Sequence, residues 1–225
     1  MSKYSVAALL FEGADVLDFT GPIEVFSLVL SKPDLDSPRV FSITTFGKTP
    51  IITASTNTLK YQVDKSFEDV KKELQEFDIL LVPGGPPTVM TNLITSNYGK
   101  DILELINTFV ALPPRENRQR ILLSVCTGAW VLGAAGVLKG RTATTHHMCY
   151  DGLKALDQSV TVAKKRWVDV GTSEAGVGIV TAGGVSSGMD AALYVVEKLT
   201  SKESAGFAAE LLEFERRGEN YVEAW

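Results

Sequence analysis

Residues 121–133, Ile-Leu-Leu-Ser-Val-Cys-Thr-Gly-Ala-Trp-Val-Leu-Gly, decide the fold. The stretch opens as an apolar run of the length of a buried strand and continues, after Cys126, as a sequence suited to a helix. A strand that ends at a nucleophile and turns at once into a helix is a nucleophile elbow, and small residues two places on either side make its tight turn possible. Ser124 and Gly128 supply these, so the sequence predicts an elbow with sulfur in place of oxygen.

Cys126 is therefore the first candidate catalytic residue. Unpaired N–H groups and the positive dipole end of the following helix are expected to favour its thiolate form over the thiol. The alternative is structural, because a free cysteine is usually a small buried apolar residue. The Thr127-Gly128 pair that follows, together with a second glycine-rich turn at Gly84-Gly85, favours the nucleophile.

The composition points to one globular domain, residues 1–225, that acts on a small molecule. A chain of 225 residues is within the range of a single α/β domain, and 45% hydrophobic residues allow a sizeable core. A net charge of −5 argues against nucleic acid or an anionic membrane surface as partner. Two cysteines make no disulfide framework, and neither a signal peptide nor a membrane-length apolar run is present, so we expect a cytoplasmic protein.

Apolar runs alternate with helical patterns along the chain. The runs that have the character of buried parallel strands are 6–11, 40–46, 79–82, 121–125 and 178–182. This alternation predicts an α/β fold with a mostly parallel sheet and helices on both faces. Residues 51–61 are expected to form a hairpin, and 160–162 and 167–170 to add antiparallel strands. Thr20 is the expected N-cap of the first helix, with Pro22 in its first turn.

Three of the predicted strands end in turns with functional character. These turns are Glu12–Asp18, Gly84-Gly85 and Cys126. Sites in open α/β sheets lie at the carboxyl ends of the strands, and a Gly-Gly pair lets backbone N–H groups approach a ligand closely. By itself the Gly-Gly pair is equally consistent with an ordinary turn. Together the three turns predict a single site at one edge of the sheet.

These motifs resemble the ThiJ/PfpI superfamily, which has a flavodoxin-like, doubly wound fold related to that of class I glutamine amidotransferases. Within it they are similar to the isocyanide hydratases and to ligand-binding domains of certain transcription regulators. The matching segments are Gly13-Ala14, Leu17–Pro22, Val82–Gly85, Ser124–Gly128 and Arg141–His146. The sequence departs from the hydratases at His147, at Pro86-Pro87 and over residues 210–225, which suggests a different substrate.

The resemblance implies a Cys126 nucleophile with Asp18 as its acid partner, a homodimer, and no metal or organic cofactor. In an isocyanide hydratase the Cys126 thiolate would attack the terminal carbon of R–N≡C to give a thioimidate, which water converts to the formamide. Asp18 can donate a proton only if burial raises its pKa. The N–H groups of Gly85 and Thr127 are expected to stabilise developing negative charge.

The remaining polar residues leave alternatives open. His146 is either a supporting residue of the site, which we favour, or the base of a Cys-His pair. His147 is expected to line the pocket, Cys149 to pack in the core, and Asp15 to be a polar group of its loop; none of these spacings matches a zinc site.

Two other functions fit the same candidate residues. One is a glyoxalase or deglycase that acts on α-oxoaldehydes, against which the Asp18 context counts. The other is a non-enzymatic sensor of oxidative stress that uses reversible oxidation of Cys126.

Overall fold

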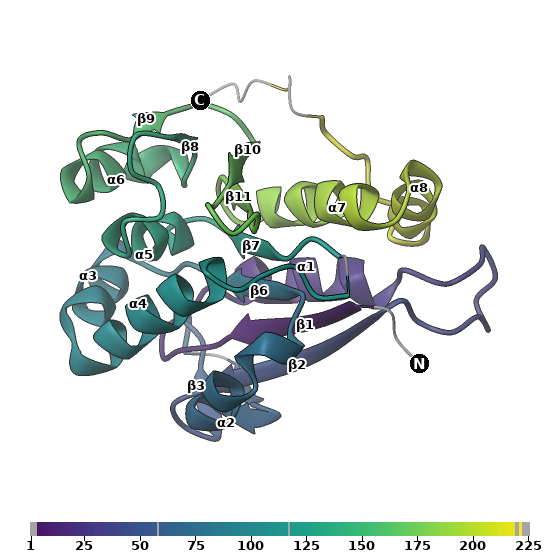
Figure 1. The fold of residues 1–225 in the computed structure, drawn as a ribbon, viewed down its shortest axis with the longest axis horizontal. Helices are drawn as coiled ribbons and strands as arrows, with labels where there is room; N and C mark the ends of the chain where they lie inside the picture. Colours follow the sequence, from purple (N-terminus) through teal and green to yellow (C-terminus); the bar gives the residue numbers. More distant parts are fainter. Residues whose placement is uncertain (1–3, 58, 117, 219–220, 222–225) are drawn as a thin grey trace.

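The computed structural model describes residues 4–57, 59–116, 118–218 and 221, and it is an α/β structure built on one large sheet (Figure 1). Seven strands form this sheet in the order β10-β11-β7-β6-β1-β2-β5. Their bounds are β1 (Tyr4–Leu9), β2 (Phe41–Gly47), β5 (Lys65–Ser66), β6 (Ile79–Val82), β7 (Ile121–Ser124), β10 (Trp167–Thr172) and β11 (Gly178–Ala182).

The sheet is parallel except at one edge, where β10 runs antiparallel to β11. Every residue of β6, β7 and β11 is buried, because continuous apolar runs are covered by helices on both sides. The predicted parallel sheet, the strands within it and the antiparallel addition at 167–170 are thus confirmed.

Two small sheets stand beside the large one. β3 (Ile51–Thr53) and β4 (Lys60–Gln62) form the predicted antiparallel hairpin. β8 (Thr142–Ala143) and β9 (Thr161–Val162) pair in parallel. The prediction that 160–162 adds an antiparallel strand is therefore wrong, because this segment binds to β8 and not to the edge of the large sheet.

The helices form two groups. In one, α1 packs on α7 and α7 on α8; in the other, α3 packs on α4 and α4 on α5. Because crossovers between parallel strands are almost always right-handed, we expect the two groups to cover opposite faces of the sheet. None of the helices in the described ranges is long and apolar enough to cross a membrane. The bounds are α1 (Val16–Ser27), α2 (Phe67–Lys72), α3 (Pro87–Thr95), α4 (Asn97–Val110), α5 (Gly128–Ala134), α6 (Tyr150–Leu156), α7 (Ser187–Leu199) and α8 (Lys202–Leu211), with short 3₁₀ helices η1 (Leu74–Glu76) and η2 (His147–Cys149).

The first helix starts earlier than the sequence indicated. α1 begins at Val16, and Thr20 is not its N-cap but lies inside it, where its hydroxyl donates to the Val16 carbonyl at 2.8 Å. Pro22 is also inside the helix and is tolerated there, although it cannot donate to the carbonyl four residues earlier. The consequence is that Asp18 belongs to the rigid first turn of α1 and not to a loop.

The carboxyl ends of the four central strands lie at the same edge of the sheet. β1, β6, β7 and β11 are neighbours and run in the same direction. Their ends lead to the turn before α1, to Gly84-Gly85, to Cys126 and to Gly183-Gly184. This is the edge at which open parallel sheets place their sites.

The approach of the elbow to β6 can be tested at Gly128. A Cβ at this position would lie 2.4 Å from the Val82 carbonyl oxygen, so we expect Gly128→Ala to lower the free energy of unfolding by about 1–3 kcal/mol. Gly206→Ala is the matched control, because Gly206 is exposed in α8 with nothing within 4 Å, and alanine is expected to stabilise that helix by up to about 1 kcal/mol. Urea denaturation of both variants measures the two effects; equal midpoints would contradict the tight elbow.

Candidate active site

Cys126 occupies the strained turn between β7 and α5. Its φ of +58° is in the left-handed region, which costs a residue other than glycine on the order of 1–3 kcal/mol. The surrounding structure maintains this conformation: the Cys126 N–H donates to the Gly183 carbonyl at 2.9 Å, and the Thr145 hydroxyl donates to the Cys126 carbonyl at 2.8 Å. The predicted sharp turn from strand to helix at Cys126 is confirmed, and the nucleophilic role of Cys126 stays a prediction.

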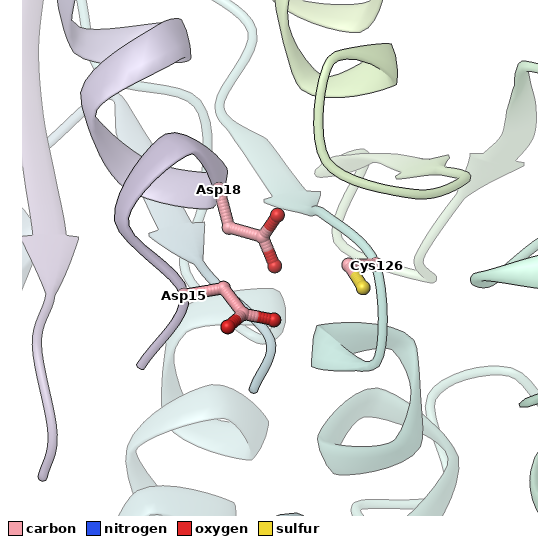
Figure 2. Close-up of side chains that lie close together, drawn as sticks. All are labelled: Asp15, Asp18 and Cys126. Carbon is pink, nitrogen blue, oxygen red and sulfur yellow. The ribbon is translucent and has the colours of Figure 1, made fainter. Parts of the chain in front are cut away.

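Asp18 is fully buried and lies opposite Cys126 (Figure 2). Its Oδ2 accepts the Gly84 N–H at 3.0 Å, whereas Oδ1 has no hydrogen-bond partner among the described residues. A buried carboxyl oxygen without a partner is costly unless it carries a proton or meets a ligand. The expected pairing of Cys126 and Asp18 is therefore present in the geometry.

Asp15 is the residue that sequence reasoning missed. One carboxylate oxygen of Asp15, one of Asp18 and the Cys126 Sγ all lie within 4.8 Å of one another. The Ser55 hydroxyl donates to Asp15 Oδ1 at 2.5 Å. The missed signal was the spacing of three residues between the two aspartates, which puts both side chains on the same side of a helix start at Val16.

Burial determines the protonation of this cluster. The pKa of Asp18 is raised to about 7: burial is the largest cause and the charge of Asp15 adds to it, while the Gly84 N–H and the Cys126 thiol act in the opposite direction. Burial likewise raises the pKa of the Cys126 thiol well above its usual range, and the charge of Asp18 adds to the increase. The prediction of a resting thiolate is wrong, because N–H donation from Thr127 and Val185 only partly offsets these effects.

Gly85 and Thr127 bind each other. The Gly85 N–H donates to Thr127 Oγ1 at 2.9 Å, and that hydroxyl donates to the Gly85 carbonyl at 2.6 Å. The prediction that the Gly85 N–H stabilises developing charge is therefore wrong, since this donor is already used. The Thr127 N–H is directed at the Cys126 sulfur, together with that of Val185, which the sequence had not indicated.

His146 is tied to its own chain. Its Nδ1 accepts the Met148 N–H at 3.2 Å, and its ring stacks on that of His147 with centroids 4.5 Å apart. Burial is the largest cause that lowers the pKa of His146, and the electrostatic effect of His147 lowers it as well. A neutral ring with Nδ1 as acceptor carries its proton on Nε2, so His146 can offer a hydrogen bond but is poorly placed to be a base.

A cavity of about 250 Å³ opens on the cluster. Cys149 is a free, buried thiol that packs in the core as expected but also reaches this cavity. Asp15, Asp18 and Cys126 are close enough to hold a cation, but a thiol that keeps its proton and a carboxyl that is protonated about half of the time at neutral pH are weak ligands. The lining residues are Asp15, Gly85, Pro86, Pro87, Cys126, Thr127, His146, Met148 and Cys149.

The pattern of the DJ-1/PfpI family matches residues 4–198. The chain belongs to this family. It is 30% identical over 209 residues to the isonitrile hydratase of Pseudomonas putida, covering 93% of this chain and 78% of that protein. A THiJ/PfpI family protein from Pseudomonas syringae has a similar structure, with a TM-score of 0.74, 24% identity, and 97% and 78% of the two chains covered.

An AraC family transcriptional regulator from Pseudomonas putida shares the fold as well. The TM-score is 0.71 at 20% identity, over 93% of this chain and 99% of that one. This likeness extends to a regulator and therefore concerns the fold alone; it does not separate the enzymes of this family from proteins with other functions.

The charge of Asp18 can be tested through the reactivity of Cys126. Because this charge raises the pKa of the thiol, we expect Asp18→Asn to lower that pKa, and alkylation at fixed pH to speed up about three- to fourfold for each unit of decrease, since a less basic thiolate is also a weaker nucleophile. Peptide mass spectrometry after iodoacetamide treatment at pH 8 gives the rate at each cysteine. Cys149 is the internal control, since burial raises its pKa and the charge of Asp18 does not. Unchanged or slower alkylation of Cys126 would contradict this electrostatic coupling.

Proposed function

We propose that this protein is an isocyanide hydratase, which converts R–N≡C and water to the formamide R–NH–CHO. The observation that carries the proposal is the buried carboxyl of Asp18 beside the Cys126 thiol, with a pKa near 7 that suits both giving and taking a proton at neutral pH. The identity to isonitrile hydratase over nearly the whole chain supports the same reaction class.

In the first step Cys126 Sγ bonds to the terminal carbon of the isocyanide. That carbon takes the proton carried by Asp18, and the thiol proton replaces it on Asp18, so the product is the thioimidate R–N=CH–S-Cys126. A thiol that keeps its proton at rest must lose it during the attack, and the adjacent carboxyl provides the acceptor. The N–H groups of Thr127 and Val185 stabilise the charge that develops on sulfur.

In the second step water adds to the thioimidate carbon, and the tetrahedral adduct expels sulfur to release the formamide. His146 lines the same cavity, and its Nε2–H is suited to bind the oxygen that is added. The cavity of about 250 Å³ has apolar walls at Pro86, Pro87 and Met148, which favours a compact alkyl or aryl group on the isocyanide.

The test is formation of the N-formamide from simple alkyl and aryl isocyanides, followed by chromatography. We expect turnover by the wild type, none by Cys126→Ala, and a loss of roughly 10²–10⁴-fold in kcat/KM for Asp18→Asn, which keeps the shape of the side chain but cannot transfer its proton. Asp36→Asn is the matched control in an exposed turn and keeps full activity.

Two outcomes would contradict the proposal. If the wild type forms no formamide while methylglyoxal is consumed, the protein is a glyoxalase or deglycase. If neither substrate turns over while peroxide oxidises Cys126 reversibly, the sensor function replaces the hydratase.

A further inference from the structure

Asp15 is a carboxylate of the candidate active site that has no role in the two steps of the proposed hydratase reaction. It lines the cavity that contains Cys126, and its carboxylate reaches within 4.8 Å of both Sγ and the Asp18 carboxyl. The two acids differ in their environment: Asp18 is fully buried, whereas Asp15 is only partly buried and borders the space open to ligands. Figure 2 shows both acids on the same side of the sulfur.

The local backbone gives Asp15 a fixed orientation. Its N–H donates to the Gly84 carbonyl at 2.9 Å, and Ser55, in the turn of the β3–β4 hairpin, donates through its hydroxyl to Asp15 Oδ1 at 2.5 Å. The Ser55 N–H in turn donates to the Ala14 carbonyl at 3.0 Å. Oδ2 accepts no hydrogen bond from the described residues, so one oxygen is held and the other remains for a ligand of the cavity.

Hydration of an isocyanide requires a base that Asp18 alone does not supply. During addition of water, one proton must leave the water while another arrives on the substrate nitrogen. Asp18 is fully buried and is not among the residues that line the cavity, whereas Asp15 lines it. Water that enters through the cavity therefore meets the Asp15 carboxylate, which can take its proton while Asp18 serves the substrate nitrogen.

We propose that Asp15 is a second catalytic residue, the general base that activates the water that attacks the thioimidate on Cys126. The inference rests on the proposed hydratase function and identifies the general base of its second step, the hydrolysis of the thioimidate. Asp15 and Asp18 then divide the work as a base that faces the cavity and an acid that is buried behind it.

The proton and electron balance of this second step is complete. Asp15 Oδ2 takes a proton from water as the water oxygen bonds to the thioimidate carbon; the π pair of C=N moves to nitrogen, which takes the proton of Asp18. On collapse the C–S bond breaks, and the departing sulfur takes the proton from Asp15. The hydroxyl proton passes to Asp18 as the formamide C=O forms, so both acids return to their starting state.

The experiment separates formation of the thioimidate from its hydrolysis. After rapid mixing with an aryl isocyanide, intact-protein mass spectrometry records Cys126 carrying the mass of one isocyanide, and chromatography records the formamide. For Asp15→Asn we expect the adduct to form and accumulate, while formamide release falls about 10²-fold or more. Hydroxylamine, which attacks without a base, is expected to clear the accumulated adduct.

Glu12→Gln is the matched control, because Glu12 is an exposed acid of the same loop whose Oε2 accepts the Thr53 N–H at 3.0 Å, outside the cavity of Cys126. It is expected to turn over as the wild type does. Ser55→Ala leaves the carboxylate in place but frees its orientation, and it should show a smaller accumulation of the adduct.

Hydrolysis of the adduct at the wild-type rate in Asp15→Asn would overturn the inference while the hydratase stands. Loss of adduct formation in that variant, with Cys126 still alkylated by iodoacetamide in a folded protein, would also overturn it, because Asp15 would then act before the second step. If the wild type forms neither the adduct nor the formamide, the proposed hydratase function itself is contradicted.

Discussion

The contact between a buried carboxyl and a buried thiol is the constraint on which the site depends. Asp18 has no exposed surface, and its pKa of about 7 lies above the ordinary value of 3.8. Since the folded-state pKa is raised, the proton on Asp18 stabilises the fold fully below about pH 4, and this contribution is lost as the pH rises to 7. The loss is at most about 4 kcal/mol, a large share of the stability of a domain.

The rest of the molecule is arranged to maintain that contact. β7 and α5 hold Cys126 in a strained conformation, α1 holds Asp18 in its first turn, and the end of β6 supplies the Gly84 N–H that binds one oxygen of Asp18. Gly84 must be glycine, because a Cβ there would lie 2.9 Å from the Asp18 carboxylate and 2.5 Å from Thr127 Oγ1. The β3–β4 hairpin adds Ser55, which fixes the second acid. Four parallel strand ends and one hairpin thus converge on three side chains.

The sequence was sufficient for the features that depend on local pattern. The apolar run before Cys126 and the small residues around it predicted the elbow, and the alternation of strands and helices predicted the parallel sheet. Cys126 and Asp18 were paired through the family resemblance, and the structure brings them together. The start of α1 was misjudged because Thr20 has the chemistry of an N-cap but uses its hydroxyl on the carbonyl four residues earlier.

Features that depend on three-dimensional surroundings could not be predicted. Cys126 is a protonated thiol because burial and the charge of Asp18 raise its pKa more than the backbone N–H groups around it lower it. The use of the Gly85 N–H by Thr127 requires two loops that are 42 residues apart to meet. Asp15 resembled any polar loop residue until the position of α1 turned it toward the sulfur. In each case the residue type can be read from the sequence, while packing determines the protonation or the hydrogen bonding of the group.

The most direct measurement of the central claim is the titration of Asp18 itself. Carbon-13 NMR of protein labelled at the aspartate carboxyl groups, compared between the wild type and Asp18→Asn, assigns its signal by difference. We predict a midpoint near pH 7, so that the carboxyl holds a proton about half of the time at neutral pH. A midpoint near pH 4 would contradict it, because Asp18 would then be a fixed anion beside the thiol and could not donate a proton.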